Sequence, residues 1–207
     1  MAARTLVNLR DAYSELVGED HVIHPCDVSD PAQARELIDR TIRELGRVDV
    51  LVNAAGVAPV KPIESTTPEI TRAALALNTE APANLIHFAW PTLLLQRDGV
   101  IVNISSMATF NPFNGFFAYA ASKAALNMLS FVTNAEGSPH EVHCYVICPG
   151  AVETPMLRSI VSPAALPTAQ TLSPDDVANV VMQCVRRERT ADAGRPILLP
   201  SPTQPAN

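Results

Sequence analysis

Lysine and concentrated positive charge are scarce in this sequence. Only Lys61 and Lys123 are lysines among 207 residues, and acidic residues outnumber lysine plus arginine by 21 to 15. The longest basic run, residues 186–189, is interrupted by a glutamate. Phosphate backbones bind to fields of clustered positive charge. Nucleic acid is therefore not an expected partner.

Long apolar runs are missing as well. Nowhere do eighteen uncharged apolar residues follow one another, and the first residues, which include Arg4 and Arg10, contain no long apolar stretch. A secretory leader or a membrane-spanning helix needs such a stretch. The sequence thus predicts a cytoplasmic protein with no membrane partner.

The four cysteines form no C-x-x-C pair, and no histidine stands at ligand spacing beside them. Structural zinc sites and redox-active cysteine pairs depend on such spacing. The sequence predicts neither a metal site nor a disulfide. We expect reduced, buried thiols at Cys26, Cys144, Cys148 and Cys184.

Apolar runs alternate with amphipathic stretches along the chain, which is typical of βα units around a parallel sheet. A chain of this length fits one domain, for which we expect residues 1–200, with 201–207 as a disordered tail. The expected strands cover residues 21–28, 48–56, 100–106, 141–150 and, at an edge, 195–200. The expected helices cover residues 6–17, 29–46, 68–96, 119–136 and 173–188.

Local signals mark the ends and bends of these helices. Gly18 and Gly46 follow the first two helices as stop signals. Pro82 and Pro91 predict bends in the third. A short strand over residues 5–9 is the alternative to the first helix.

The pentapeptide YAASK places one of the two lysines four residues after a tyrosine. On a helix such residues share a face, so Lys123 would lie one turn beyond Tyr119. A nearby ammonium group favours the phenolate and lowers the pKa of a phenol from its ordinary value near 10. Reaching neutral pH takes about three pKa units, or roughly 4 kcal/mol, so a second positive charge such as an oxidised nicotinamide ring is needed. The spacing favours an acid/base pair, with a packed tyrosine beside a surface lysine as the alternative.

Six motifs follow one another in a fixed order. They are CDVSD at 26–30, LVNAAG at 51–56, ALNTEAP at 76–82, GVIVNISS at 99–106, YAASK at 119–123 and CPGAVETPM at 148–156. In this order and spacing they resemble the short-chain dehydrogenase/reductase family over nearly the whole sequence. The resemblance implies a Rossmann-like, doubly wound α/β fold and an NAD(P)-dependent oxidoreductase. Hydride would move between the nicotinamide and the carbonyl or alcohol carbon of a small, apolar substrate.

The resemblance also implies four catalytic residues. Tyr119 would exchange a proton with the substrate oxygen, and Ser106 would hydrogen-bond that oxygen and stabilise its developing charge. Lys123 would lower the pKa of the tyrosine and hold the nicotinamide ribose. Asn78 would hold a water that links Lys123 to solvent. The alternative for Asn78 is a side chain that satisfies backbone groups at a helix irregularity near Pro82.

For the cofactor, NAD or NADP, the resemblance implies binding at three places. The first is at the adenine, the second is a run of small residues that lets the backbone approach the adenosine ribose, and the third is a turn at the carboxamide and phosphates. Besides Tyr119 and Lys123, the implied residues are Asp27, Val28, Asn53, Ala55, Gly56, Pro149, Gly150, Val152 and Thr154. Ala54 departs from the family pattern, in which a second asparagine is commoner, and this weakens a hydrogen bond between strands.

The glycine-rich turn with which the family binds phosphates, T-G-x-x-x-G-x-G, is absent from the sequence. The fold is therefore predicted to be truncated at its N-terminus, without its first two strands and the helix between them. In the strand order 3-2-1-4-5-6 these strands lie between strands 21–28 and 48–56. Either the neighbours close the gap or strand 21–28 stays unpaired, with an exposed edge. The residue that distinguishes NAD from NADP would be lost with the second strand.

Two functions follow from the resemblance and this gap. One is a complete reductase whose sequence continues upstream of Met1. The other is an inactive homologue that binds no dinucleotide and acts, if at all, through protein interaction. In the first, segment 155–171 would form the substrate lid. Helices 68–96 and 119–136 resemble those through which the family forms homo-dimers and homo-tetramers.

Four phenylalanines stand close together before the tyrosine. They would line an apolar pocket for an alcohol or ketone beside Ser106 and Tyr119, or two of them would simply pack the core. The four are Phe110, Phe113, Phe116 and Phe117.

Overall fold

The computed structural model describes residues 1–18 and 20–202. The strands are β1 (Ala2–Ala3), β2 (His24–Pro25), β3 (Val50–Asn53), β4 (Val100–Ile104), β5 (His143–Pro149) and β6 (Pro196–Leu199). The α-helices are α1 (Leu6–Ser14), α2 (Pro31–Leu45), α3 (Pro68–Leu75), α4 (Ala81–Gln96), α5 (Phe117–Gly137), α6 (Pro155–Arg158) and α7 (Pro174–Val185). The strands pair in parallel, which confirms the predicted Rossmann-like α/β class.

The strands form two separate sheets rather than one. The first contains β1 and β2, and the second has the order β3-β4-β5-β6. Both expected outcomes for the gap are wrong, because β2 pairs with β1 and has no pairing with β3 in the described chain. A strand therefore stands beside β2, where the sequence predicted none. With only two residues, β1 is too short to show the alternating pattern by which a strand is recognised.

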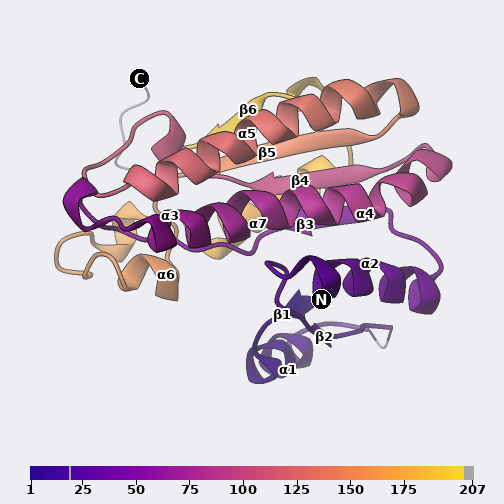
Figure 1. Cartoon of the computed structure of the whole chain (residues 1–207), viewed down its shortest axis with the longest axis horizontal. Coiled ribbons are helices and arrows are strands. Elements are labelled where there is room, and N and C mark those ends of the chain that lie inside the picture. The colour runs from indigo at the N-terminus through magenta and orange to yellow at the C-terminus, as the bar shows by residue number, and fades with distance from the viewer. Residues whose placement is uncertain (19, 203–207) are drawn as a thin grey trace.

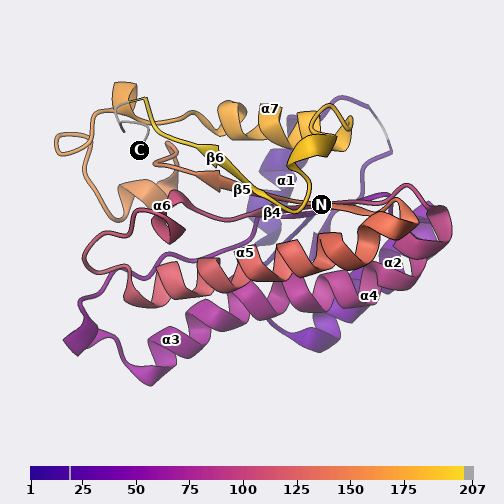
Figure 2. The same cartoon turned by 90° about the horizontal axis from the view of Figure 1, so that it is seen from above.

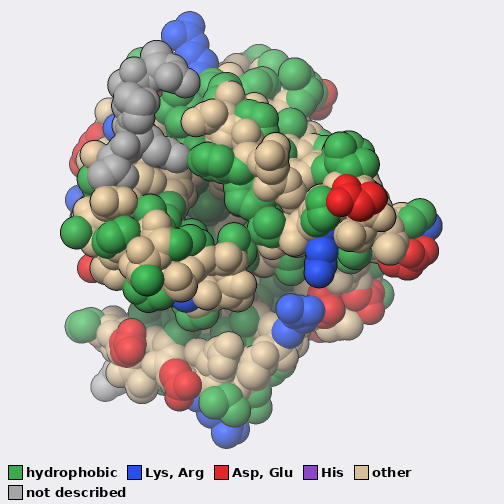
Figure 3. Space-filling model, turned by 90° about the vertical axis from the view of Figure 1, so that its left-hand side faces the viewer, with side chains coloured by type: hydrophobic (Ala, Val, Ile, Leu, Met, Phe, Trp, Pro, Cys, Tyr) green, Lys and Arg blue, Asp and Glu red, His purple; other side chains and the backbone are tan. Residues whose placement is uncertain are grey.

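β3 is left at the edge of the four-stranded sheet. Its Val50 and Val52 side chains are 37% and 42% exposed, although the surrounding sequence is typical of a buried strand. The N-terminal unit of α1, β1, β2 and α2 lies to one side of this sheet (Figure 1). On the face that Figure 3 shows, a hollow with hydrophobic side chains at its walls lies between the two parts, which are joined where α2 packs against α4. An open edge of this kind is a place where another strand can pair.

Helices cover both faces of the four-stranded sheet. α4 and α5 lie on one face and α7 on the other (Figure 2). On the first face, α2 packs against α4 through Ala34, Ile38, Leu85 and Ala89, all of them buried. The second face buries the side chains of β4 and β5 under α7. The central strands are thus fixed from both sides, so the loops at their carboxyl ends start from a rigid base.

Most helix ends follow the predicted signals. The side chain of Asp30 caps α2, and Gly46 ends that helix with a φ of 81°. Ser173 and Asp176 form a reciprocal capping box at the start of α7. The opening helix is confirmed in place of a strand over residues 5–9, although it ends at Ser14. The four cysteines are buried and unpaired, as predicted.

The predicted helix 68–96 is interrupted by a π-helical segment, Ala76–Glu80, that joins α3 to α4. The cause is local, because Pro82 has no N–H and cannot bond the carbonyl of Asn78 as a regular α-helix requires. Pro91 lies inside α4, which continues past it. Single-turn π segments of this kind recur at functional sites.

The first residue of the predicted tail, Ser201, lies within the described part of the chain. Residues 203–207 of the predicted tail lie outside the described residues. Ser201 is buried, and its hydroxyl oxygen accepts a hydrogen bond from the Ala151 N–H at 2.8 Å. Ser201 therefore belongs to the folded part. Among the helices that the structure describes, none combines the length and apolar character that crossing a bilayer requires.

Candidate active site

The predicted catalytic residues gather at the carboxyl end of β4. Ser106 follows this strand and caps a short 3₁₀ turn, with its hydroxyl accepting the Ala108 N–H at 3.1 Å. Tyr119 and Lys123 lie in the first two turns of α5. The Lys123 Nζ donates a hydrogen bond to the Ile104 carbonyl at 2.8 Å. The lysine thus joins the tyrosine helix to the end of the strand that leads to Ser106.

The environment of Tyr119 shifts its pKa upward. Burial is the larger cause, and a hydrogen bond with the Ser106 hydroxyl acts in the opposite direction. The sequence argument expected Lys123 to lower this pKa, but Lys123 is not among the groups that shift it. With a pKa of about 8, Lys123 has already lost its charge in the range above pH 10 where Tyr119 titrates. The same argument required a second positive charge, and among the described residues the groups that shift the pKa of Tyr119 include no cation.

Lys123 is itself strongly perturbed. Its side chain is only 6% exposed, and burial lowers its pKa from 10.5 to about 8. The Cys148 thiol acts weakly in the opposite direction. A lysine with this pKa exchanges its proton near neutral pH, as acid/base chemistry requires.

Asn78 is completely buried in the π-helical segment. Its Oδ1 accepts the Val57 N–H, and its Nδ2 donates to the Val57 carbonyl and the Ser122 hydroxyl, each at 2.9 Å. Both amide hydrogens are therefore used inside the protein, in the backbone-satisfying role that the sequence left as an alternative. The backbone carbonyl of Asn78 lacks its usual α-helical donor at Pro82, so it is the group suited to hold a water.

The loop after β3 passes very close to these residues. A Cβ on Gly56 would lie 3.1 Å from the Asn78 Oδ1 and 3.4 Å from the Lys123 Nζ. Only glycine leaves this space open. At the end of β3, Asn53 donates to the Asn103 Oδ1 at 2.7 Å, and its own buried Oδ1 has no partner among the described residues.

Two of the residues present fit an NAD(P) molecule. Lys123 has hydrogens to donate beyond its single bond, and Gly56 carries no side chain that would keep a ligand from the backbone. Pro149 and Gly150 end β5 at the same edge, and the Gly150 N–H bonds the Leu199 carbonyl at 2.8 Å.

The other predicted cofactor residues lie further along the same edge or on the other sheet. Thr154 caps α6, where its hydroxyl accepts the Leu157 N–H at 3.2 Å and donates to the Val152 carbonyl at 3.1 Å. Val28 and Asp27 follow β2 in the two-stranded sheet. Hydrogen bonds from the hydroxyl and N–H of Ser29 lower the pKa of Asp27. Ala55 is exposed in the loop after β3.

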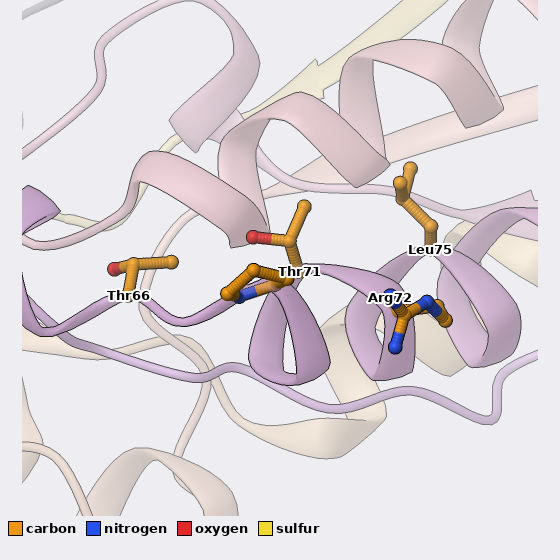
Figure 4. A pocket seen from close by; sticks show the side chains of 5 residues that line it. Thr66, Thr71, Arg72 and Leu75 are labelled. Atoms are coloured by element: carbon orange, nitrogen blue, oxygen red, sulfur yellow. The ribbon is translucent and has the colours of Figure 1, made fainter.

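One surface depression of the protein does not coincide with this site. It has a volume of about 410 Å³ and lies at the start of α3 (Figure 4). It is lined by Thr66, Pro68, Thr71, Arg72 and Leu75. None of these is a predicted site residue, and the depression is shallow and open, so the chemistry of the tyrosine and lysine decides the location of the site.

Two residues near the site were not singled out from the sequence. Ser122 bonds Asn78, and Cys148 is a buried thiol whose pKa is raised to about 11, chiefly by burial. The position of Ser122 inside YAASK was a usable signal. Nothing in the sequence indicates that Cys148 lies near Lys123, because the two are brought together only by the packing of α5 on β5.

The parallel sheets, with a serine, a tyrosine and a lysine at the carboxyl end of β4, define a Rossmann-like α/β protein. A family model described as short chain dehydrogenase matches residues 1–165. The chain belongs to this family.

Several relatives are dehydrogenases by name. The chain is 35% identical over 134 residues to 2,3-dihydro-2,3-dihydroxybenzoate dehydrogenase of Escherichia coli, which covers 65% of this chain and 54% of that protein. It is 34% identical over 188 residues to 1-deoxy-11-beta-hydroxypentalenate dehydrogenase of Streptomyces avermitilis, covering 87% and 69%. The chain thus spans about half the length of the first of these relatives.

A solved structure supports the fold. A Burkholderia xenovorans protein assigned to the short-chain dehydrogenases/reductases superimposes with a TM-score of 0.86 at 26% identity. The superposition covers 96% of this chain and 81% of that one.

Proposed function

We propose that this chain carries the acid/base site of an NAD(P)-dependent oxidoreductase that interconverts a small, apolar alcohol and its ketone. The observation that carries the proposal is the placement of Lys123, buried one helical turn after Tyr119 and bonded to the end of β4. Burying a lysine costs stability, and lysines with strongly perturbed pKa values cluster at functional sites. Membership of a family with named dehydrogenases supports the same reaction class.

Each residue has a distinct role in this proposal. When bound, the cofactor supplies or accepts the hydride. Tyr119 donates a proton to the substrate oxygen during reduction and takes it back during oxidation. Ser106 donates a hydrogen bond to the same oxygen and stabilises its developing negative charge. Lys123 would hold the nicotinamide ribose and supply protons next to Tyr119, and the Asn78 carbonyl would hold a water that links Lys123 to solvent.

The apolar character of the substrate rests on the residues before Tyr119. The Phe116 ring packs edge-on against the Tyr119 ring, with centroids 5.4 Å apart, and Phe113 packs against Phe116 at 5.7 Å. Phe110, Phe113 and Phe117 are about half exposed, so they do not pack the core. Phe113→Asp is expected to lose activity on apolar ketones while dinucleotide binding stays unchanged. Equal activity of the variant would contradict the apolar pocket.

The test of the reaction class is oxidation of NADH or NADPH by the purified chain in the presence of apolar cyclic ketones. Tyr119→Phe is expected to lower turnover by about 100-fold or more, because it removes the proton donor. Tyr13→Phe is the matched control, since Tyr13 lies on α1 away from β4. Turnover that survives in Tyr119→Phe would refute the proposed role of the tyrosine.

A second candidate function is an inactive homologue that acts through protein interaction. The open edge of β3, with its exposed valines, favours it. A folded chain that shows no turnover but pairs with another chain through this edge would support this candidate. The cytoplasmic location, the homo-dimeric or homo-tetrameric assembly and the choice between NAD and NADP stay predictions.

A further inference from the structure

A chain of hydrogen bonds connects the loop after β3 to the backbone of the tyrosine helix. It starts at Val57, whose N–H and carbonyl both bond the Asn78 amide at 2.9 Å. Asn78 donates in turn to the Ser122 hydroxyl at 2.9 Å, and Ser122 donates to the Tyr119 carbonyl at 2.8 Å. Among the residues in this series of hydrogen bonds, Ser122 is the only one whose side chain comes from α5.

A second bond to the same residue strengthens the connection. The Thr79 hydroxyl donates to the backbone carbonyl of Ser122 at 2.9 Å. Asn78 and Thr79 both belong to the π-helical segment, so this irregular turn is attached to α5 at one position through two bonds. Both Asn78 and Ser122 are completely buried, where water cannot replace a lost partner.

These hydrogen bonds hold the loop after β3 next to the ammonium group of Lys123. Gly56 precedes Val57, and a Cβ at Gly56 would lie only 3.4 Å from the Lys123 Nζ. The position of this loop therefore decides how tightly the ammonium group is enclosed. Ser122 and Lys123 are neighbours in the chain, so a movement of α5 relative to the loop changes both.

We infer that Ser122 is a positioning residue that fixes the loop of Gly56 and Val57 against the helix of Tyr119 and Lys123. The inference deepens the proposed function, since it concerns the geometry of the same acid/base pair. Without the Ser122 hydroxyl, one buried amide hydrogen of Asn78 loses its acceptor, and of the two bonds from the π-helical segment to Ser122 the one from Thr79 to the backbone carbonyl remains. The loop then moves away from Lys123, and water reaches the ammonium group.

The chain offers a closely matched control. Ser130 lies two turns further along α5 and is also completely buried. Its hydroxyl accepts from the Asn103 Nδ2 at 2.8 Å and donates to the Leu126 carbonyl at 2.7 Å. Ser130→Ala thus removes the same kind of bond from the same helix, away from Tyr119.

The first readout does not depend on activity. Because the chain has only two lysines, isotope-labelled lysine gives two Cε signals in an NMR titration, and Lys123→Met assigns them. In Ser122→Ala, the pKa of Lys123 is expected to rise from about 8 toward 10.5, because the ammonium group becomes hydrated. Ser130→Ala is expected to leave this titration unchanged while losing comparable thermal stability.

The second readout is turnover. In Ser122→Ala, kcat is expected to fall by about tenfold or more with KM for the dinucleotide within about twofold, since the reacting groups are misplaced while binding persists. Similar changes in Ser122→Ala and Ser130→Ala, in either readout, would overturn the inference. If the unaltered chain shows no turnover, the proposed function fails, and the lysine titration still decides the inference. If Ser122→Ala does not fold, the same two measurements are made on Ser122→Cys. This variant replaces the hydroxyl with a thiol of similar size that forms weaker hydrogen bonds.

Discussion

The ammonium nitrogen of Lys123 lies 2.8 Å from the backbone carbonyl oxygen of Ile104 and donates a hydrogen bond to it. This bond connects the first turns of α5 to the last residue of β4. Because Ser106 follows two residues later, the same contact sets the position of the serine relative to Tyr119. The charge of Lys123 is thereby held in a place where it costs stability.

The first prediction concerns that cost. The folded-state pKa of Lys123, about 8, is below its ordinary value of 10.5, so the unfolded chain binds this proton more tightly. The buried charge lowers the free energy of unfolding by its full amount below pH 8. This destabilisation disappears as pH rises to 10.5. Lys123→Met is therefore expected to be more stable than the unaltered chain at neutral pH, by up to about 3 kcal/mol.

The measurement is denaturant unfolding of both chains between neutral pH and pH 10.5. The difference between them is expected to shrink over this interval, and taking the difference removes the contributions of cysteines and tyrosines that titrate in the same range. A difference that does not change with pH would show that Lys123 is not buried as a charge.

A second prediction concerns the polar side chains that link β3, β4 and α5. Asn53 donates to Asn103 at 2.7 Å, and Asn103 donates to Ser130 at 2.8 Å, all within the core. Asn103→Leu removes both bonds and leaves a buried donor of Asn53 without a partner. The free energy of unfolding is expected to fall by about 2 kcal/mol. Asn8→Ala, on the exposed side of α1, should change it by less than about 0.5 kcal/mol.

A third prediction concerns the segment that follows Thr154. The Arg158 Nε donates to the Glu153 Oε1 at 2.6 Å, and the Arg158 Nη1 donates to the Leu166 carbonyl at 2.9 Å. These bonds close the loop over residues 153–166. Glu153→Gln removes the charge pair, so amide hydrogen exchange is expected to accelerate in this loop and not in α7. Glu136→Gln, an exposed glutamate on α5, is the control.

Amide hydrogen exchange in this loop should also accelerate as pH falls into the acidic range, relative to exchange in Glu153→Gln. The hydrogen bond from Arg158 is the main cause that lowers the pKa of Glu153 from 4.5 to about 2. The contribution of this pair is present above pH 4.5 and is lost as pH falls through about 2. The exchange rates of the loop in the unaltered chain should therefore approach those of Glu153→Gln only as pH falls toward 2. Equal exchange rates in the two chains at neutral pH would contradict the predicted role of the pair.

A fourth prediction concerns the open edge of β3. Val52 is 42% exposed there, and an unpaired apolar edge promotes association. Val52→Lys is expected to reduce the concentration-dependent self-association of the chain in sedimentation experiments. Leu95→Lys changes a side chain that is 86% exposed on α4 and should have little effect. Equal association of the two variants would show that the edge is not involved.

The sequence predicts the helices and the site more completely than the sheet. Asp30, Gly46 and Ser173 have local signals that act within a few residues, and the structure follows them. The pairing of β1 with β2 depends on contacts between distant residues and involves too few of them to leave a pattern. Pro82 predicted a bend, whereas the π turn before it also depends on the bonds of Asn78 to Val57 and Ser122.

The placement of Tyr119 and Lys123 was predictable from the sequence, whereas the direction in which the pKa of Tyr119 shifts was not. The spacing of Tyr119 and Lys123 indicates a pair on one helical face, and the structure has it. The upward shift in the pKa of Tyr119 depends chiefly on burial, which the spacing does not encode.

The most direct test of the central claim is the titration of Tyr119 with and without oxidised NAD or NADP. Isotope-labelled tyrosine gives three Cζ signals, which the three Tyr→Phe variants assign. In the chain alone, the pKa of Tyr119 should lie above its ordinary value of 10. The account predicts that it falls when the oxidised dinucleotide brings the second positive charge, while Tyr13 and Tyr145 do not respond. An unchanged Tyr119 titration at saturating dinucleotide would contradict the assignment of Tyr119 and Lys123 as the acid/base pair.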